Sequence, residues 1–115
     1  MSLRLIDGIY YANYKPIVVN LRIAKEIVKQ RKSVTLGEGY PFVVDIRYTK
    51  GFRMDAVNYF SSDESIDDIS RLALIIKSKF VAKLANLYYI IVKPRIPTKL
   101  FSSEKEAKEW ICWIL

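Results

Sequence analysis

Side chains that could do chemistry are limited in type in this sequence of 115 residues. It contains no histidine, which excludes Ser-His-Asp and Cys-His nucleophile systems, imidazole acid–base pairs and histidine-ligated metals. Cys112 is the single cysteine, so a thiolate zinc site is excluded as well. The glycines, at positions 8, 37, 39 and 51, form neither a GxxxxGK nor a GxGxxG motif. We therefore expect no enzymatic activity and no cofactor.

Four carboxylates within six residues form the densest group of potential metal ligands: Asp63, Glu64, Asp67 and Asp68. Carboxylate oxygens in such a cluster could chelate a divalent cation. Their spacing lacks the Asp-x-Asp-x-Asp-Gly pattern of a calcium loop, and a solvated loop or the start of a helical turn explains the cluster more simply. We therefore expect no bound metal.

Positive charge is the sharpest functional signal in the sequence. The formal net charge is +7 and the pI is near 9.5. Between Ile69 and Ser103 there is no acid, and the basic residues are Arg71, Lys77, Lys79, Lys83, Lys93, Arg95 and Lys99. Such an excess of cations is compatible with an anionic lipid surface, with a nucleic acid, or with a solvated helix face.

Two helix faces make up the candidate interaction surface. A helix that we expect to begin at Ser78 would turn outward Lys79, Lys83, Asn86 and Ile90, with Tyr89 at the margin. Lysines beside an exposed aliphatic and an aromatic side chain suit contact with anionic lipid head groups. We prefer a solvated face whose apolar residues are covered by another subunit. An earlier helix adds a cationic stripe formed by Arg22, Lys25, Lys29 and Lys32.

Nucleic-acid binding is a third interpretation of the same charge, since a protein that neutralises several phosphates needs a basic surface. The basic stripe of the first helix has no interleaved aromatic residues, and the sequence contains no recognised nucleic-acid-binding motif. We therefore rank a nucleic-acid partner below protein and lipid partners.

Hydrophobic patterns and turn residues indicate the elements that would position these side chains. Pro41 to Ile46 and Leu72 to Ile76 are short apolar runs typical of buried strands. Asp7-Gly8 suits a two-residue hairpin turn, and Asn20 can cap a helix. The expected strands are 3–6, 9–14, 41–46, 72–76 and 98–101, and the expected helices are 21–33, 53–61, 78–92 and one that follows a capping box of Ser103 and Glu106.

This order predicts a single α/β domain over residues 1–115, with a mixed, mostly parallel sheet, an N-terminal antiparallel hairpin and about four covering helices. In the last helix the core stripe would be Ala107, Trp110, Ile111 and Ile114, with Trp113 partly exposed. No apolar run reaches the roughly 20 residues of a membrane span, and no signal peptide is visible. The expected compartment is the cytoplasm, with association with a membrane surface as the alternative.

A family resemblance rests on this order of elements. A hairpin, a helix, a strand ending in Val43-Val44-Asp45-Ile46, a short helix and a closing β-α-β-α resemble the STAS domain, the SpoIIAA-like fold of anti-sigma-factor antagonists. The closing segment is more specifically similar to small STAS-like proteins of unknown function from Bacteroidetes-type bacteria. Its shared residues are Lys93-Pro94, Pro97, Lys99-Leu100-Phe101, Glu106-Ala107 and Trp110-Ile111.

The resemblance also directs attention to the start of the second helix. In the antagonists a phosphorylatable serine stands there, whereas the matching positions in this sequence are Met54 and Asp55. Asp55 is explained most simply as a carboxylate favoured by the helix dipole, and a fixed stand-in for phosphoserine is the alternative. The resemblance further implies that Asp45 anchors the loop after its strand through hydrogen bonds to backbone amides.

These observations favour a non-catalytic regulatory or interaction module that binds a protein partner or a second copy of itself. Peripheral membrane or lipid binding through the helix expected from Ser78 is the alternative. Neither the partner nor the biological process is indicated by any motif.

Overall fold

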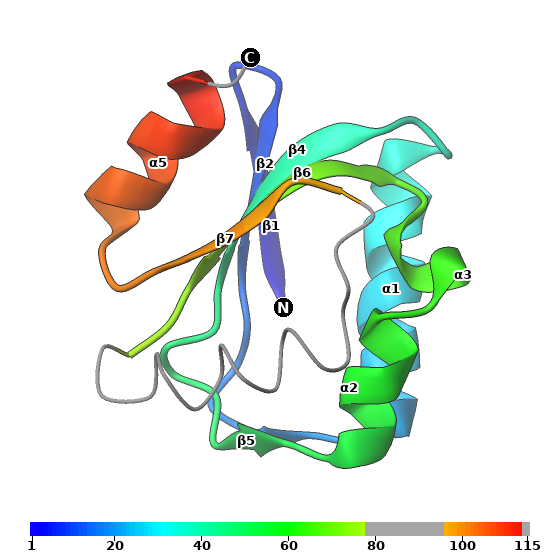
Figure 1. The fold of residues 1–115 in the computed structure, drawn as a ribbon. Coiled ribbons are helices and arrows are strands. Elements are labelled where there is room, and N and C mark those ends of the chain that lie inside the picture. The colour runs from blue at the N-terminus through cyan, green and yellow to red at the C-terminus, as the bar shows by residue number, and fades with distance from the viewer. Residues whose placement is uncertain (78–95, 114–115) are drawn as a thin grey trace.

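A five-stranded sheet forms the centre of the protein, as the computed structural model shows for residues 1–77 and 96–113 (Figure 1). Its strand order is β1-β2-β4-β6-β7. The strands are β1 (Ser2–Ile6), β2 (Ile9–Asn13), β4 (Tyr40–Asp45), β6 (Ile69–Ile75) and β7 (Thr98–Phe101). The β1–β2 pair is antiparallel, and the other three pairs are parallel. The predicted mixed, mostly parallel sheet with an N-terminal hairpin is confirmed.

The hairpin turn has the backbone conformation that its sequence predicts. Asp7 and Gly8 both have positive φ angles, of 51° and 80°. Positive φ at both central residues defines a type I′ turn, whose twist matches that of the flanking strands. Aspartate and glycine are among the residues that tolerate this conformation best, so the turn also sets the register in which Ile6 faces Ile9.

The two apolar runs lie side by side in the middle of the sheet, since β4 pairs with β6. Phe42, Val43 and Val44 are all buried, so β4 has no solvent-facing side at these positions. In β6 the structure differs from the expectation of a fully buried strand. The strand begins at Ile69, three residues early, and Leu72 and Leu74 are only half-buried.

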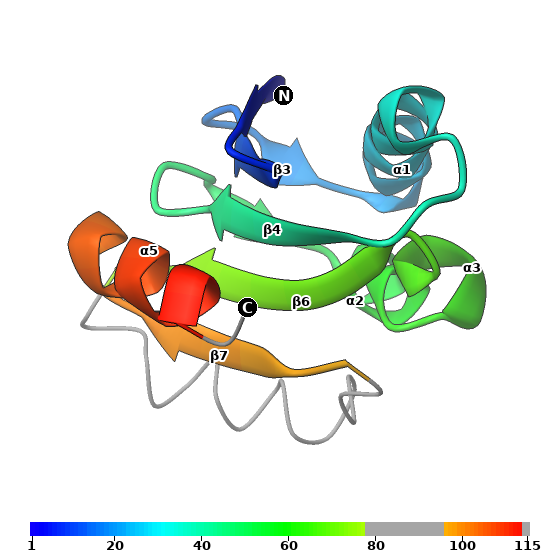
Figure 2. The ribbon, with the colours of Figure 1, turned by 90° about the horizontal axis from the view of Figure 1, so that it is seen from above.

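Helices cover both faces of the sheet (Figures 1 and 2). On one side lie α1 (Leu21–Thr35), α2 (Met54–Phe60) and α3 (Asp63–Ile66), and on the other lies α5 (Glu104–Trp113). Ala107 and Ile111 of α5 are completely buried and Trp110 packs partly buried against the same cluster, as the predicted core stripe requires. Trp113 is 85% exposed, more than the partial exposure that we expected. Ile114 and the helix expected over 78–92 lie outside the described residues.

Side-chain caps begin three of the described helices, and two of these caps were predicted. The backbone N–H of Ile23 donates a 2.9 Å hydrogen bond to Oδ1 of Asn20, which confirms the cap of α1. The backbone N–H of Glu106 donates to Oγ of Ser103 over 3.4 Å, which is one half of the predicted capping box. Helix α1 extends two residues beyond the predicted end, to Thr35, and is closed by Leu36 in the left-handed conformation.

Two short strands were missed by the sequence analysis. β3 (Val18–Val19) and β5 (Gly51–Phe52) pair in parallel as a separate two-stranded sheet, within segments that we expected to be loops. A strand of two residues has too few positions to show an alternating pattern. Its formation depends on the partner segment, more than 30 residues away in the sequence, and so on the tertiary fold.

Candidate functional site

The structure describes only part of the predicted interaction surface. Lys79, Lys83, Asn86, Tyr89 and Ile90 lie outside the described residues. The remaining members, on α1, are Arg22, Lys25 and Lys29, and all three are exposed.

The basic residues of α1 do not form the uniform solvated stripe that their spacing predicts. Arg22 pairs with Glu26 of the same helix over 3.3 Å. The ammonium of Lys25 lies 5.9 Å from the ring centroid of Tyr59 in α2, a cation–π arrangement. Lys32 turns toward α3, where it donates to the carbonyl of Glu64 and pairs with Asp67 over 2.9 Å. The neighbouring helices α2 and α3 thus engage Lys25 and Lys32.

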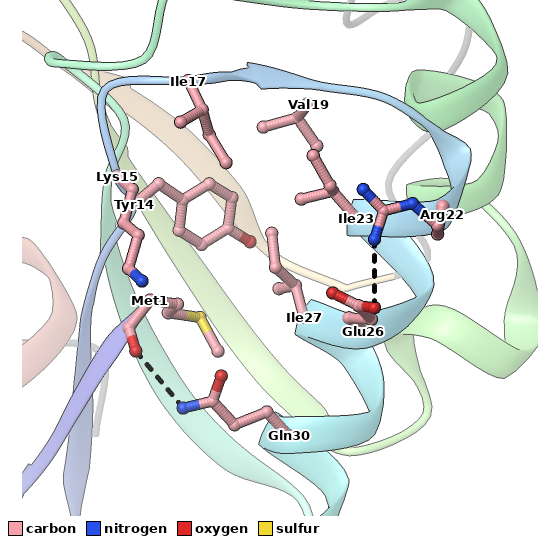
Figure 3. Close-up of a pocket in the computed structure, with 10 residues that line it drawn as sticks. All are labelled: Met1, Tyr14, Lys15, Ile17, Val19, Arg22, Ile23, Glu26, Ile27 and Gln30. Carbon is pink, nitrogen blue, oxygen red and sulfur yellow. Dashed lines mark hydrogen bonds and ion pairs between the residues drawn. The ribbon is translucent and has the colours of Figure 1, made fainter.

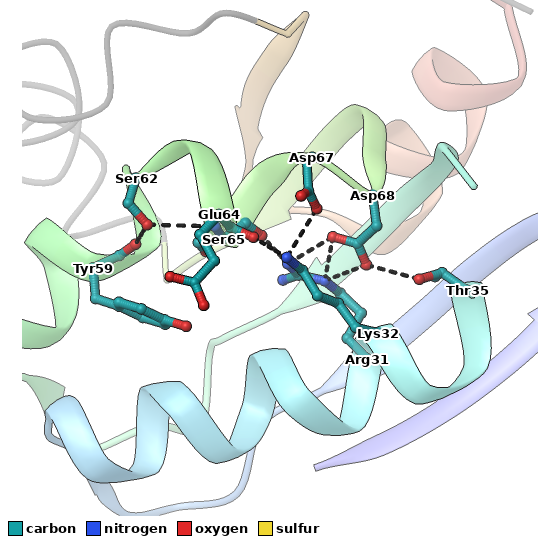
Figure 4. Close-up of polar contacts among 9 residues, drawn as sticks. All are labelled: Arg31, Lys32, Thr35, Tyr59, Ser62, Glu64, Ser65, Asp67 and Asp68. Atoms are coloured by element: carbon teal, nitrogen blue, oxygen red, sulfur yellow. Dashed lines mark hydrogen bonds and ion pairs between the residues drawn. The ribbon is translucent and has the colours of Figure 1, made fainter. Parts of the chain in front are cut away.

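A buried ion pair beneath this stripe was not foreseen (Figure 4). Nε of Arg31 lies 2.9 Å from Oδ2 of Asp68, and its Nη2 lies 2.8 Å from Oδ1. Arg31 is 5% exposed and Asp68 is 0% exposed. The hydroxyl of Thr35 also donates to Asp68, and Nη2 of Arg31 donates to the carbonyl of Ser65. The guanidinium and carboxylate therefore satisfy each other and tie α1 to the segment that leads into β6.

A sequence signal for this pair did exist. Arg31 follows Ile27 and Val28 at helical spacings of four and three, so it lies on the apolar stripe of α1 and not on its cationic face. A charged residue on an apolar stripe requires a buried counter-charge. Asp68, at the end of the acidic cluster, is that partner, and its carboxylate is committed to a structural role.

The acidic cluster is dispersed by this arrangement. Asp63 and Glu64 lie in the first turn of α3, which is capped by Ser62, while Asp67 is largely exposed and pairs with Lys32. Within residues 1–77 and 96–113, no three acidic or cysteine side chains gather as metal ligands would.

The start of α2, which the family resemblance singles out, lies beyond the carboxyl end of β4. Met54 is the first helical residue and is 55% exposed, and Asp55 lies in the first turn. Arg53, which precedes them, donates its backbone N–H to the carbonyl of Val19 over 2.8 Å. The positions that match the phosphoserine region are therefore presented at the surface by the β3–β5 sheet.

Asp45 anchors the loop between β4 and β5, as predicted. Its Oδ1 accepts the backbone N–H of Arg47 over 3.0 Å, and the guanidinium of Arg47 binds the same carboxylate through Nε at 3.0 Å and Nη2 at 2.7 Å. This hydrogen bonding raises the pKa of Arg47. The two-point contact holds the loop in one conformation and orients Tyr48, whose ring centroid lies 5.7 Å from the Arg47 guanidinium.

Three exposed apolar side chains lie in the segments around the β3–β5 pair. Val18 is 44% exposed and Tyr48 is 62% exposed, and both lie in segments joined to the start of α2 by the β3–β5 pairing. We define the carboxyl-edge surface as Val18, Tyr48 and Met54 together with the basic residues Arg47, Lys50 and Arg53. Asp45 and Arg47 are paired with each other, and Glu104 also interacts electrostatically with Arg47, while Asp55 is an exposed acid in the first turn of α2.

A hollow of about 360 Å³ lies beside this surface, between α1 and the segment from β2 to β3 (Figure 3). Figure 3 shows the ring of Tyr14 and the side chains of Ile17, Val19, Ile23 and Ile27 pointing into it. Its polar rim consists of Lys15, Arg22, Glu26 and Gln30, and the last of these donates to the carbonyl of Met1 over 3.2 Å. Arg22 was expected only as a surface residue, and the cavity beside it was not predicted from the sequence.

The titrating groups in the hollow respond to burial. Burial raises the pKa of Tyr14 to about 12, although the charge of Arg31 opposes the shift. Burial and then the charge of Lys15 lower the pKa of the Met1 ammonium group. Tyr14 therefore remains a protonated hydroxyl near neutral pH, and the surroundings of Lys15 are electrostatically positive.

The fold is SpoIIAA-like. An uncharacterised protein of the DUF3478 family from Shewanella loihica PV-4, whose crystal structure has a SpoIIAA-like fold, superposes with a TM-score of 0.65 at 15% sequence identity. The alignment covers 96% of this chain and 91% of that chain. A likeness at this level of identity concerns the fold alone.

The chain belongs to the family described as Domain of unknown function (DUF7793), whose sequence model matches residues 1–113. A comparison with curated proteins found no match. Among the helices that the structure describes, none has the length and apolar character needed to cross a membrane.

Proposed function

We propose that this protein is a non-catalytic regulatory module that binds a protein partner through the carboxyl-edge surface. The observation that supports this proposal is the exposure of Val18, Tyr48 and Met54 in the segments around the β3–β5 pair. Aromatic residues and methionine are enriched at the centres of protein interfaces, where they bury apolar area at a low entropic cost. The region is also held rigidly, by the β3–β5 pairing and by the Asp45–Arg47 contact, so little ordering would be required on binding.

The charges of the same surface indicate the chemistry of the partner. Lys50 and Arg53 are exposed in the same segments as the apolar residues, whereas Arg47 is paired with Asp45, and Asp55 is an exposed acid at the start of α2. A basic rim accelerates association with an acidic surface and disfavours basic partners. The partner would therefore present an apolar patch with acidic residues around it.

The resemblance to STAS domains supports the location of this surface but not a phosphorylation switch at it. Anti-sigma-factor antagonists carry their phosphorylatable serine where this chain has Met54 and Asp55, and neither side chain can accept a phosphoryl group as a serine hydroxyl does. We propose that binding here is constitutive, or is controlled through the partner. We also propose that the chain is related to small STAS-like proteins from Bacteroidetes-type bacteria, as the residues of its closing segment suggest.

A capture experiment tests the carboxyl-edge surface. Immobilised wild-type protein and the variants Tyr48→Asp and Met54→Asp are exposed to cytosol of the source cells, and bound proteins are identified by mass spectrometry. The matched control is Leu36→Asp, which places the same charge on an exposed apolar residue outside this surface. A partner retained by the wild type and by the control, but lost by both edge variants, supports the proposal. A partner retained equally by all four proteins contradicts it.

Contact with an anionic membrane surface is a second candidate, because lysine and arginine beside exposed tyrosine and methionine also suit lipid head groups. Co-sedimentation with vesicles of phosphatidylserine and phosphatidylcholine at two salt concentrations separates the two functions. Salt-sensitive binding that is lost in Lys50→Glu/Arg53→Glu supports the membrane function. If the protein does not bind these vesicles even at low salt, the membrane function is excluded and binding of a protein partner is favoured.

A further inference from the structure

We infer that the hollow between α1 and the β2–β3 segment is a binding site for a small organic monoanion with an apolar body, such as a medium-chain carboxylate. This site is separate from the carboxyl-edge surface and does not depend on the function proposed for it. With about 360 Å³, the hollow is at the lower end of the range of roughly 300–1,000 Å³ that ligand pockets span.

The walls of the hollow suit the apolar part of such a ligand. Val19 is 1% exposed and Ile27 is 7% exposed, so the floor is part of the packed core formed by α1, α2 and β3. Ile17 and Ile23 form less buried walls on opposite sides. In Figure 3 these branched side chains surround the central space together with the ring of Tyr14. An aliphatic chain bound there would remove from water both its own apolar surface and that of the walls.

The charges of the rim select the sign of the ligand. Arg22 is paired with Glu26 over 3.3 Å, so these two residues contribute little net charge. Lys15 lines the same hollow, and within the described part of the chain no carboxylate is paired with it. Lys15 and the Met1 ammonium group together leave this rim positive, which favours a negative charge on the ligand. A dianion would bring its second charge toward Glu26, which opposes its binding.

Tyr14 contributes a second polar group to the hollow. Its ring points into the hollow in Figure 3, and its backbone adjoins that of Lys15. Because its hydroxyl stays protonated near neutral pH, it can donate a hydrogen bond to a carboxylate. A donor hydroxyl and an ammonium group are the combination that a carboxylate can use together.

Titration of the full chain with octanoate, followed by amide chemical shifts in ¹⁵N-HSQC spectra, tests this inference. The expected result is saturable shifts at residues lining the hollow, with octan-1-ol and octylamine each binding at least about tenfold more weakly because they lack the charge that Lys15 recognises. Equal affinity for octan-1-ol would overturn the assignment of an anion site. Absence of shifts in the hollow at saturating octanoate would overturn the site altogether.

Two pairs of variants locate the binding site. Lys15→Gln is expected to weaken octanoate binding about tenfold, whereas Lys50→Gln, which removes an equal charge outside the hollow, leaves it unchanged. Ile17→Asp is expected to abolish binding, while Val18→Asp, at the next residue and of similar exposure, preserves it. Both aspartate variants alter exposed positions, so their HSQC spectra also report directly whether the fold is intact. Equal losses within either pair would contradict the location of the site.

Discussion

Breaking the Arg31–Asp68 pair is the most direct test of how the helical side of the sheet is held together. In Asp68→Ala the guanidinium of Arg31, which is 5% exposed, loses both of its carboxylate contacts and cannot reach bulk water. Removing one partner of a buried pair costs about 3–5 kcal/mol, mainly because the remaining charge stays desolvated. That is a large part of the roughly 5–15 kcal/mol by which a domain is stable.

The double variant separates the pair from its surroundings. Arg31→Met keeps an unbranched apolar stem near the ring of Phe42, over which the guanidinium now lies at 5.8 Å. Combined with Asp68→Ala, it leaves no buried charge, although the hydroxyl of Thr35 and the carbonyl of Ser65 lose their partners. We expect the double variant to be more stable than the sum of the single losses predicts, with a coupling energy of about 2–3 kcal/mol.

Urea denaturation followed by circular dichroism measures these free energies of unfolding. The control is Glu26→Ala, which breaks the exposed Arg22–Glu26 pair at a cost of about 0.3–0.5 kcal/mol. If Asp68→Ala also costs less than about 1 kcal/mol, or if the coupling energy is close to zero, the pair behaves as a surface ion pair and the reasoning from burial is refuted.

Three further predictions concern caps and titration. Asn20→Ala removes the acceptor of the Ile23 N–H at the start of α1 and should lower the free energy of unfolding by about 1 kcal/mol in urea, whereas an unchanged midpoint would show that water replaces the cap. Leu36→Gly relieves a φ of 53° at an exposed position and should raise the melting temperature, with a net gain of about 0.5–1 kcal/mol after the added entropy of the unfolded chain; a lower melting temperature would contradict this. Because the folded-state pKa of Tyr14 is about 12 and its unfolded value is 10.0, its contribution to stability is complete below pH 10 and is lost as the pH rises toward 12, by an amount on the order of 2 kcal/mol. Denaturation of wild type and Tyr14→Phe between pH 9 and 12 should show a steeper loss in the wild type, and parallel curves would refute the shift.

Much of the fold could be predicted from the sequence because it depends on local preferences. Asp7-Gly8 favours one turn type, and Asn20 caps α1 through its own side chain. The continuous apolar run of β4 is typical of a strand that is buried on both faces. Each of these features involves residues within a few positions of one another. Their free energies favour the same elements whatever the remainder of the chain does.

The candidate site depended on contacts between distant parts of the chain. Val18 meets Gly51, Lys25 meets Tyr59, and Arg31 meets Asp68, across separations that no local pattern describes. The hollow likewise arises because the β2–β3 segment passes α1 at a distance, which is a property of packing and not of any motif. The sequence by itself determined the turns, the caps and the central strands, whereas the tertiary structure decided which charges are buried, which remain free and where a cavity is left. The physical reason is that charge burial and cavity shape depend on the surroundings supplied by the rest of the fold.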